Sequence, residues 1–153
     1  MKNQNIFQNK ILITALIADA LAQILKPFYN ALVTRKWDFT LAFGNGGFPS
    51  SHSAAVTAIT TRIAMEYGLS SPLFAISAIF SSIVIFDATG VRQEVGKHSK
   101  TLNDLLLALK MKEQIGFKDL EELIGHSFFE VMGGIILGIS VAFLLLLFPF
   151  FYV

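Results

Sequence analysis

The feature that most constrains the fold of this 153-residue chain is an uncharged apolar run at its C-terminal end. The run covers residues 131–153 and reads VMGGIILGISVAFLLLLFPFFYV. Because a helix needs about 20 consecutive apolar residues to cross a bilayer, this run predicts a transmembrane helix. The composition agrees, since 15% of the residues are charged, whereas soluble domains carry about 25%. We therefore predict an integral membrane protein.

The N-terminal apolar segment predicts a second membrane helix. Residues 11–33 carry only two charges, on Asp19 and Lys26, and Pro27 is expected to kink the helix. A signal peptide is the alternative, because lysines precede the run and the small residues of 18–22 resemble a cleavage site. The charge of Asp19 and the continuation of the apolar run past this point argue against that alternative.

Two further segments complete a bundle of about four transmembrane helices. Residues 67–86 are uncharged, and Gly68 followed by Pro72 indicates that one helix stops and another starts there. Residues 53–67 predict a shorter helix, buried among the others. The expected fold is a single all-α domain over residues 1–153, a multi-pass helical bundle embedded in the lipid bilayer.

The segment 92–125 differs from the rest, because it holds six of the twelve basic residues. Four leucines recur at i, i+3, i+4 and i+7, which is typical of one face of an amphipathic helix: Leu102, Leu105, Leu106 and Leu109. Gly116 should end this helix, and 117–124 predicts a second short one. We expect this helical pair to lie at the membrane surface or to cap the bundle.

The distribution of lysine and arginine predicts the orientation of the bundle. With four spans, the loops around 26–52 and 92–125 fall on one side and carry nine of the twelve cations. The positive-inside rule then places both loops in the cytoplasm. The net charge of +1 gives no bulk signal for a nucleic-acid partner.

The residue inventory excludes or disfavours several kinds of chemistry. The chain has no cysteine, which excludes disulfides, thiolate nucleophiles and thiolate metal ligands. Its three histidines, His52, His98 and His126, lack the close spacing of a zinc site, so we expect no bound metal.

A polar cluster, GNGGFPSSHS at 44–53, stands just before the alanine-rich helix. Glycines and serines at a helix N-terminus offer backbone and hydroxyl donors that suit phosphate. The simpler interpretation is that Ser50, Ser51 or Ser53 caps the helix. A cap does not require His52, and this histidine keeps the phosphate hypothesis open.

A second cluster, GHSFFEVMGG at 125–134, places His126 four residues before Glu130. One helical turn would bring the two side by side, and a carboxylate orients the imidazole of a nucleophile or base in this way. Ser127 and Glu130 equally fit a capping box at the start of the last helix. Spacing alone does not decide between the two.

A third cluster, FDATGVRQEVGKHS at 86–99, contains Asp87 and Arg92. Arg92 would clamp phosphate oxygens or, more simply, snorkel at the membrane edge. Lys26 and Arg35 allow the same two interpretations. Asp87 is costly at the end of an apolar helix, which suggests a partner or a function.

Three blocks, GGFPSSHSAAVTA, FDATGVRQEVGKHSKTLN and GHSFFEVMGGIILG, resemble the signature blocks of the divergent phosphatidic acid phosphatase type 2 family. These are small membrane proteins related to acid phosphatases and vanadium-dependent haloperoxidases. The resemblance runs from about residue 26 to 138, with the blocks in the same order. It implies a helical fold and a phosphate site that needs no metal or other cofactor, and that would also bind vanadate.

The resemblance implies roles for the histidines and the residues around them. His126 would match the histidine nucleophile, and Glu130 its orienting carboxylate in place of aspartate. His52 would be the general acid for the leaving group. Ser50 and Ser51, from a Pro-Ser-Ser-His form of the first histidine motif, would add hydrogen bonds.

The resemblance also implies phosphate clamps, and here the chain departs from the wider superfamily. Lys26 and Arg35 would form the first clamp, but position 33, where the superfamily's arginine is expected, is Val. Position 120, six residues before the second histidine, is Leu where an arginine is expected, so Arg92 would substitute from another helix. Ser51 stands where glycine is usual. These departures bear on catalysis more than on the fold.

The leading hypothesis is a metal-independent membrane phosphatase that hydrolyses a phosphate ester or pyrophosphate, in particular of a lipid, through a phosphohistidine. The alternative is a non-catalytic membrane protein that binds or transports a phosphorylated ligand with a degenerate site. A third interpretation is purely structural, with caps and juxtamembrane charges in a helper subunit.

Overall fold

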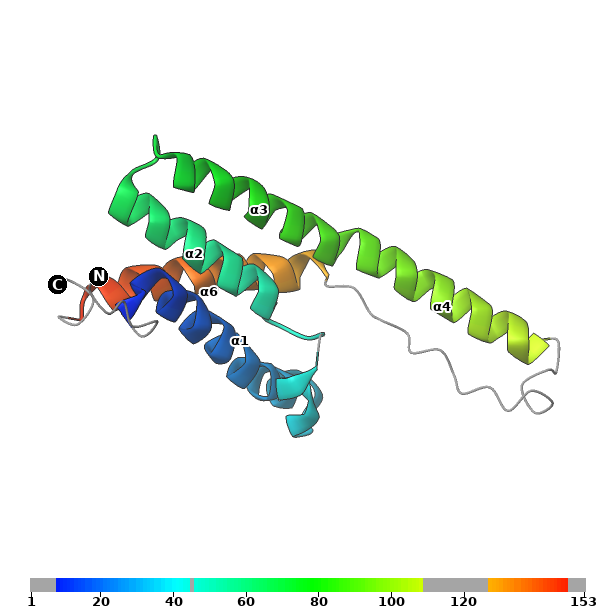
Figure 1. The fold of residues 1–153 in the computed structure, drawn as a ribbon. Coiled ribbons are helices and arrows are strands. Elements are labelled where there is room, and N and C mark those ends of the chain that lie inside the picture. The colour runs from blue at the N-terminus through cyan, green and yellow to red at the C-terminus, as the bar shows by residue number, and fades with distance from the viewer. Residues whose placement is uncertain (1–7, 45, 109–126, 149–153) are drawn as a thin grey trace.

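The structure, a computed structural model, describes residues 8–44, 46–108 and 127–148, and these are all-helical apart from their loops (Figure 1). The elements are α1 (Lys10–Thr34), the short 3-10 helix η2 (Phe39–Phe43), α2 (Ser51–Tyr67), α3 (Pro72–Thr89), α4 (Val91–Ala108) and α6 (Phe128–Leu146). The expectation of an all-α membrane bundle is confirmed.

Local sequence signals set the helix boundaries. Asn9 and Ser71 cap α1 and α3, each through a side-chain oxygen that accepts a hydrogen bond from the backbone N–H three residues later. Pro72 occupies the start of α3, where its missing N–H would be unpaired in any case. Gly68 ends α2 with a φ of 80°, in the left-handed region that favours glycine. The predicted stop at Gly68 and restart at Pro72 are therefore confirmed.

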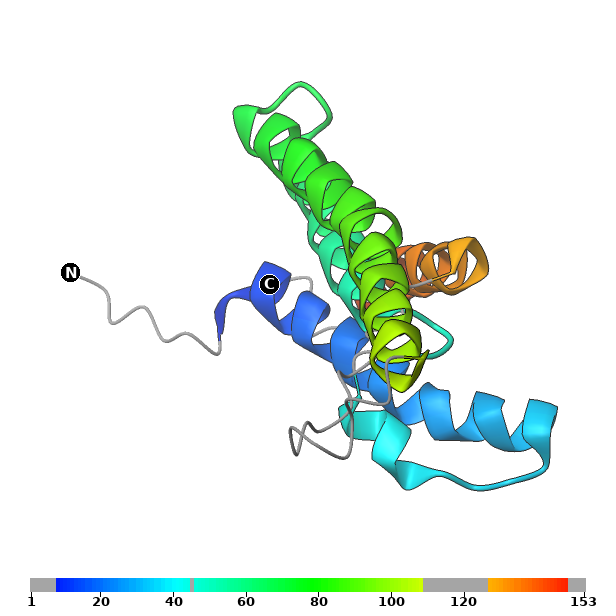
Figure 2. The ribbon, with the colours of Figure 1, turned by 90° about the vertical axis from the view of Figure 1, so that its right-hand side faces the viewer.

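The central helix is α2, which packs against α1, α3 and α6 (Figures 1 and 2). Small side chains make this packing close, and the main buried cluster consists of Ala18, Ala22, Ala54, Ala58 and Val141. Glycines of α6 bring it nearer still, since a Cβ at Gly138 would lie 2.4 Å from the carbonyl oxygen of Ala54. Small residues at crossings let membrane helices associate through van der Waals contact.

Three stretches of helix in the described residues are long and apolar enough to cross a membrane: Lys10–Thr34, Pro72–Leu107 and Phe128–Leu146. The remaining long helix, α2, has 17 residues, and it corresponds to the shorter, buried helix predicted over 53–67. The bundle therefore combines spanning helices with an interior helix that they surround.

The N-terminal helix α1 is part of the bundle along most of its length. Ala18 and Ala22 are fully buried in the core shared with α2. Pro27 lies inside α1 without ending it, and α1 changes direction in its C-terminal half (Figure 2).

Four helix termini lie at one end of the bundle, namely the C-terminal ends of α1 and α3 and the N-terminal ends of α2 and α6 (Figure 1). The loops that follow α1 and α3 therefore leave from the same end. Beyond Gly90, α4 continues from α3 and extends away from the other helices (Figures 1 and 2). Its Leu102 and Leu105 are exposed, as expected of an amphipathic surface helix, whereas 117–124 lies outside the described residues.

Candidate functional site

The first turn of α2 is fixed in place by α6. The backbone N–H of Ser50 donates a 2.9 Å hydrogen bond to the carbonyl oxygen of Glu130. Gly134 lies directly behind this contact, because a Cβ there would come within 2.3 Å of the carbonyl oxygen of Ser50. Two predicted site segments, 44–53 and 125–134, are thus joined through the backbone.

The two serines at the start of α2 have different roles. Ser50 is the N-cap, and its Oγ accepts hydrogen bonds from the N–H of Ser53 at 3.3 Å and from the Oγ of Ser53 at 3.1 Å. The capping interpretation is therefore correct for Ser50. Ser51 does not cap the helix, since its Oγ accepts a 3.2 Å hydrogen bond from Nε2 of Gln23 on α1. His52 follows it in the first turn of α2, half-buried, with Nδ1 shielded from solvent.

Lys26 is buried at the same end of the bundle, with 1% of the residue exposed. Its Nζ donates a 2.8 Å hydrogen bond to the carbonyl oxygen of Gly44, and its methylene groups lie against Gly47. Gly47 has a φ of 99°, which explains why a glycine is needed where the loop passes over the lysine. Asp19 and Glu130 are the carboxylates whose charges act on the ammonium group.

Glu130 caps α6, as one of the two interpretations of its spacing predicted. Its Oε2 accepts a 3.1 Å hydrogen bond from the N–H of Ser127, and Ser127 Oγ accepts one from the N–H of Glu130. This is a complete capping box, and α6 begins at Phe128. The other interpretation pairs Glu130 with His126, which lies outside the described residues.

The other predicted clamps are placed less centrally or not described. Arg35 is exposed at the C-terminus of α1 with a φ of 58°, about 13 Å of helix rise from Lys26. The backbone of Arg92 lies in the first turn of α4, but its side chain is outside the described residues, as is Leu120. The structure thus gathers Lys26, Ser50, Ser51, His52 and Glu130 at one end of the bundle.

Sequence reasoning missed Gln23. Asp19, Gln23 and Lys26 follow at i, i+4 and i+7, so they form a polar stripe on one face of an otherwise apolar helix. That periodicity was the signal that would have found it. The stripe faces α2 and the glycine-rich loop, where Gln23 contacts Ser51 and Lys26 contacts Gly44.

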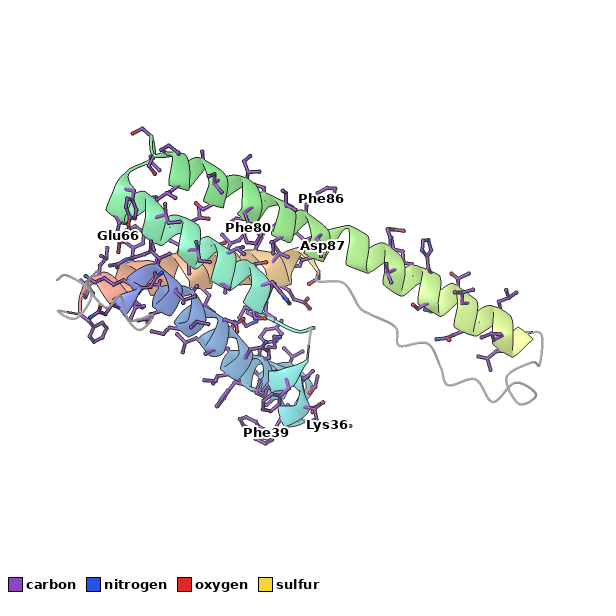
Figure 3. The ribbon with its side chains drawn as sticks, in the orientation of Figure 1. Lys36, Phe39, Glu66, Phe80, Phe86 and Asp87 are labelled. Carbon is purple, nitrogen blue, oxygen red and sulfur yellow. The ribbon has the colours of Figure 1, made fainter. Side chains whose placement is uncertain are left out.

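A buried ion pair at the far end of α2 was also missed. Arg62 is 1% exposed, and its Nε donates a 2.6 Å hydrogen bond to Oε1 of Glu66, four residues on. Figure 3 shows Glu66 at the C-terminal end of α2 and Asp87 near the C-terminal end of α3, at opposite ends of the bundle. The Arg62 pair is therefore separate from the cluster around His52.

An apolar groove of about 410 Å³ adjoins the cluster. It lies between α1 and α6 and is lined by, among others, Leu25, Tyr29, Phe48, Pro49 and Ile136. The ring of Phe48 stacks at a tilt on Tyr29, with 4.4 Å between the ring centroids. Pro49 connects this groove to the start of α2, because it directly precedes Ser50.

The sequence led us to expect no bound metal, and the side chains that could hold one in this chain are carboxylates and histidines. Among the residues that the structure describes, no group of three or more histidines, aspartates or glutamates is arranged to hold a metal ion. The donors gathered near His52 are instead an ammonium, hydroxyls and a helix N-terminus, a set whose chemistry suits an anion.

The fold and this cluster define a helical membrane protein whose polar residues gather at one end of the bundle. The chain belongs to the Divergent PAP2 family, whose pattern matches residues 7–141. It is 43% identical over 139 residues to a Bacillus subtilis (strain 168) protein called "Uncharacterized membrane protein YuiD". The aligned region covers 84% of this chain and 88% of that protein. No solved structure matches the chain. The family resemblance read from the sequence is thereby confirmed.

Proposed function

We propose that the protein is a membrane phosphatase that hydrolyses a phosphate ester or pyrophosphate, in particular of a lipid. One observation supports this most directly, namely that buried Lys26 lies at the end of the bundle where α2 presents Ser51 and His52. A helix N-terminus carries partial positive charge and offers N–H donors. A buried cation in a membrane bundle is costly, so its presence points to a function.

The proposed reaction has two steps. His126 attacks phosphorus and forms a phosphohistidine, while the bond to the leaving oxygen breaks and that oxygen takes a proton from His52. Water then attacks the phosphohistidine, gives its proton back to His52 and releases phosphate. Glu130 would orient His126, and Lys26, with Arg35 and Arg92, would offset the charge on the phosphoryl oxygens.

The apolar groove supports a lipid as the substrate. Its wall includes Pro49, one residue from the cap of α2, so a phosphate near His52 would have an apolar surface beside it. A hydrocarbon chain in the groove would contact Leu25 and Ile136 while its headgroup lies at the polar end of the bundle. This arrangement predicts that a lipid phosphate is hydrolysed faster than a soluble aryl phosphate.

The test is phosphate release from phosphatidic acid, a prenyl pyrophosphate and an aryl phosphate by purified protein in micelles containing EDTA. We expect EDTA-resistant release that falls at least about a thousandfold in both His52→Ala and His126→Ala, because each removes a reacting group. His98→Ala is the matched control, since His98 is exposed on α4. Unchanged release in His126→Ala, or none from folded wild-type protein, would overturn the proposal.

Binding without hydrolysis is a second candidate, and specific contacts favour it. Glu130, the proposed orienting carboxylate, is engaged in both hydrogen bonds of the capping box of α6. This residue therefore already has a structural role that needs no catalytic histidine. Binding of vanadate by wild-type protein, with no phosphate released from any of the three substrates, would select this function over catalysis.

A further inference from the structure

The hydrogen bond between Gln23 and Ser51 joins two helices at the point where the proposed anion would bind. Gln23 lies on α1 and Ser51 is the first residue of α2, and 28 positions separate them in the chain. Ser51 is 2% exposed, so its hydroxyl has little access to bulk solvent. Neither side chain is needed to cap α2, because Ser50 already does so.

The direction of this hydrogen bond leaves the Ser51 proton available. Nε2 of Gln23 is the donor and Ser51 Oγ is the acceptor, so the hydroxyl hydrogen of Ser51 is not used in the contact. Within the described part of the chain, Ser51 Oγ makes no second hydrogen bond that would use it. A hydroxyl that accepts one hydrogen bond is polarised and donates a stronger one.

The other end of the Gln23 amide, its carbonyl oxygen, lacks a hydrogen-bond partner within the part of the chain that the structure describes. This oxygen, Oε1, is buried. A buried acceptor without a hydrogen bond costs free energy of folding. We therefore expect the position of the Gln23 side chain to serve a purpose other than stability. Among the described residues, the contact with Ser51 is the one hydrogen bond of this amide.

We propose that Gln23 is a positioning residue that holds the Ser51 hydroxyl so that it donates to an oxygen of a tetrahedral oxyanion bound at the start of α2. This inference rests on the proposed anion site. Ser51 touches the anion and Gln23 acts through Ser51. Ser51 thus supplies a donor that a glycine at the same position would lack, and α1 takes part in the site through its polar stripe.

The experiment measures vanadate affinity by calorimetry for purified wild-type protein, Gln23→Met, Ser51→Ala and the double variant. We expect Ser51→Ala to weaken binding about tenfold, since it removes one hydrogen bond to a charged group. Gln23→Met should weaken it about three- to tenfold, and the double variant should bind no worse than Ser51→Ala. That non-additivity distinguishes action through Ser51 from a general loss of structure.

Asn30→Met is the matched control, because it removes another amide hydrogen bond of α1, one that goes to the carbonyl of Lys36. Gln23→Met that binds like the control, or effects that multiply in the double variant, would overturn the inference while leaving the anion site intact. His52→Ala tests the site itself. Folded wild-type protein that neither binds vanadate nor releases phosphate would overturn the proposed function, and this inference with it.

Discussion

Replacing Gly138 by alanine tests the close crossing of α2 and α6 on which the position of the site depends. A Cβ at this position would lie 2.4 Å from the carbonyl oxygen of Ala54 and 3.0 Å from the backbone nitrogen of Ala58. Because ordinary contacts begin near 3.4 Å, the shorter of these is too close by about 1 Å. Both obstacles are backbone atoms of a helix, so no side-chain rotation relieves them, and α6 has to move away from α2.

Two opposing effects decide the size of the change in stability. Overpacking of this kind costs about 1–3 kcal/mol, whereas alanine in a helix is more favourable than glycine by up to about 1 kcal/mol. Since the clash is with backbone, we expect the upper part of the overpacking range. The free energy of unfolding of Gly138→Ala should therefore fall by about 1–2 kcal/mol, a five- to thirtyfold loss in the folded-to-unfolded ratio.

The measurement is an SDS titration in mixed micelles, followed by far-ultraviolet circular dichroism. Gly46→Ala is the control, because no heavy atom lies within 4 Å of a Cβ added there, and its stability should stay within about 0.5 kcal/mol of wild type. The sign of the change is decisive. A Gly138→Ala protein that is as stable as wild type, or more stable, would show that helix propensity dominates and that the close crossing is wrong.

Three further predictions concern the charged residues of the bundle. Lys26→Met should lower vanadate affinity at least about tenfold, because it removes a buried cation beside the first turn of α2; equal affinity in calorimetry would contradict this. Glu66→Gln should lower the free energy of unfolding by about 1–3 kcal/mol, since it leaves the buried Arg62 without its carboxylate. This loss is smaller than for a fully buried ion pair, because 28% of the Glu66 side chain is exposed. Lys97→Ala should leave the free energy of unfolding unchanged within error, because both Lys97 and Glu94 are more than half exposed. A clear loss of stability in the same titration would show that α4 is packed in the membrane-bound protein.

Much of the fold could be predicted because the deciding signals are local. The apolar runs, the stop at Gly68 and the restart at Pro72 each depend on a few neighbouring residues, and the structure places the helices accordingly. The course of α4 beyond Gly90 was not predictable in the same way. Its apolar periodicity predicts an amphipathic helix, but that pattern does not say in which direction the helix leaves α3.

The candidate site was predicted less completely, because its contacts join residues far apart in the chain. The serines at 50 and 51 looked equivalent in the sequence, since either fits a helix cap. Only the packing of α1 against α2 distinguishes them, because it brings Gln23 to Ser51 and leaves the capping role to Ser50. The spacing of Ser127 and Glu130 did contain the capping box, but it could not show that Glu130 also accepts the backbone hydrogen bond of Ser50.

That backbone hydrogen bond also bears on the two-histidine hypothesis. His52 is two residues from Ser50, whose N–H bonds to the carbonyl of Glu130. The α2–α6 crossing therefore places His52 close to the start of α6. His126 precedes α6 in the sequence and lies outside the described residues, so the two-histidine hypothesis stays a prediction. A variant that separates the two helices, such as Gly134→Ala behind Ser50, should weaken vanadate binding as well as stability, whereas Gly138→Ala, a turn further from the site, should reduce stability more than binding.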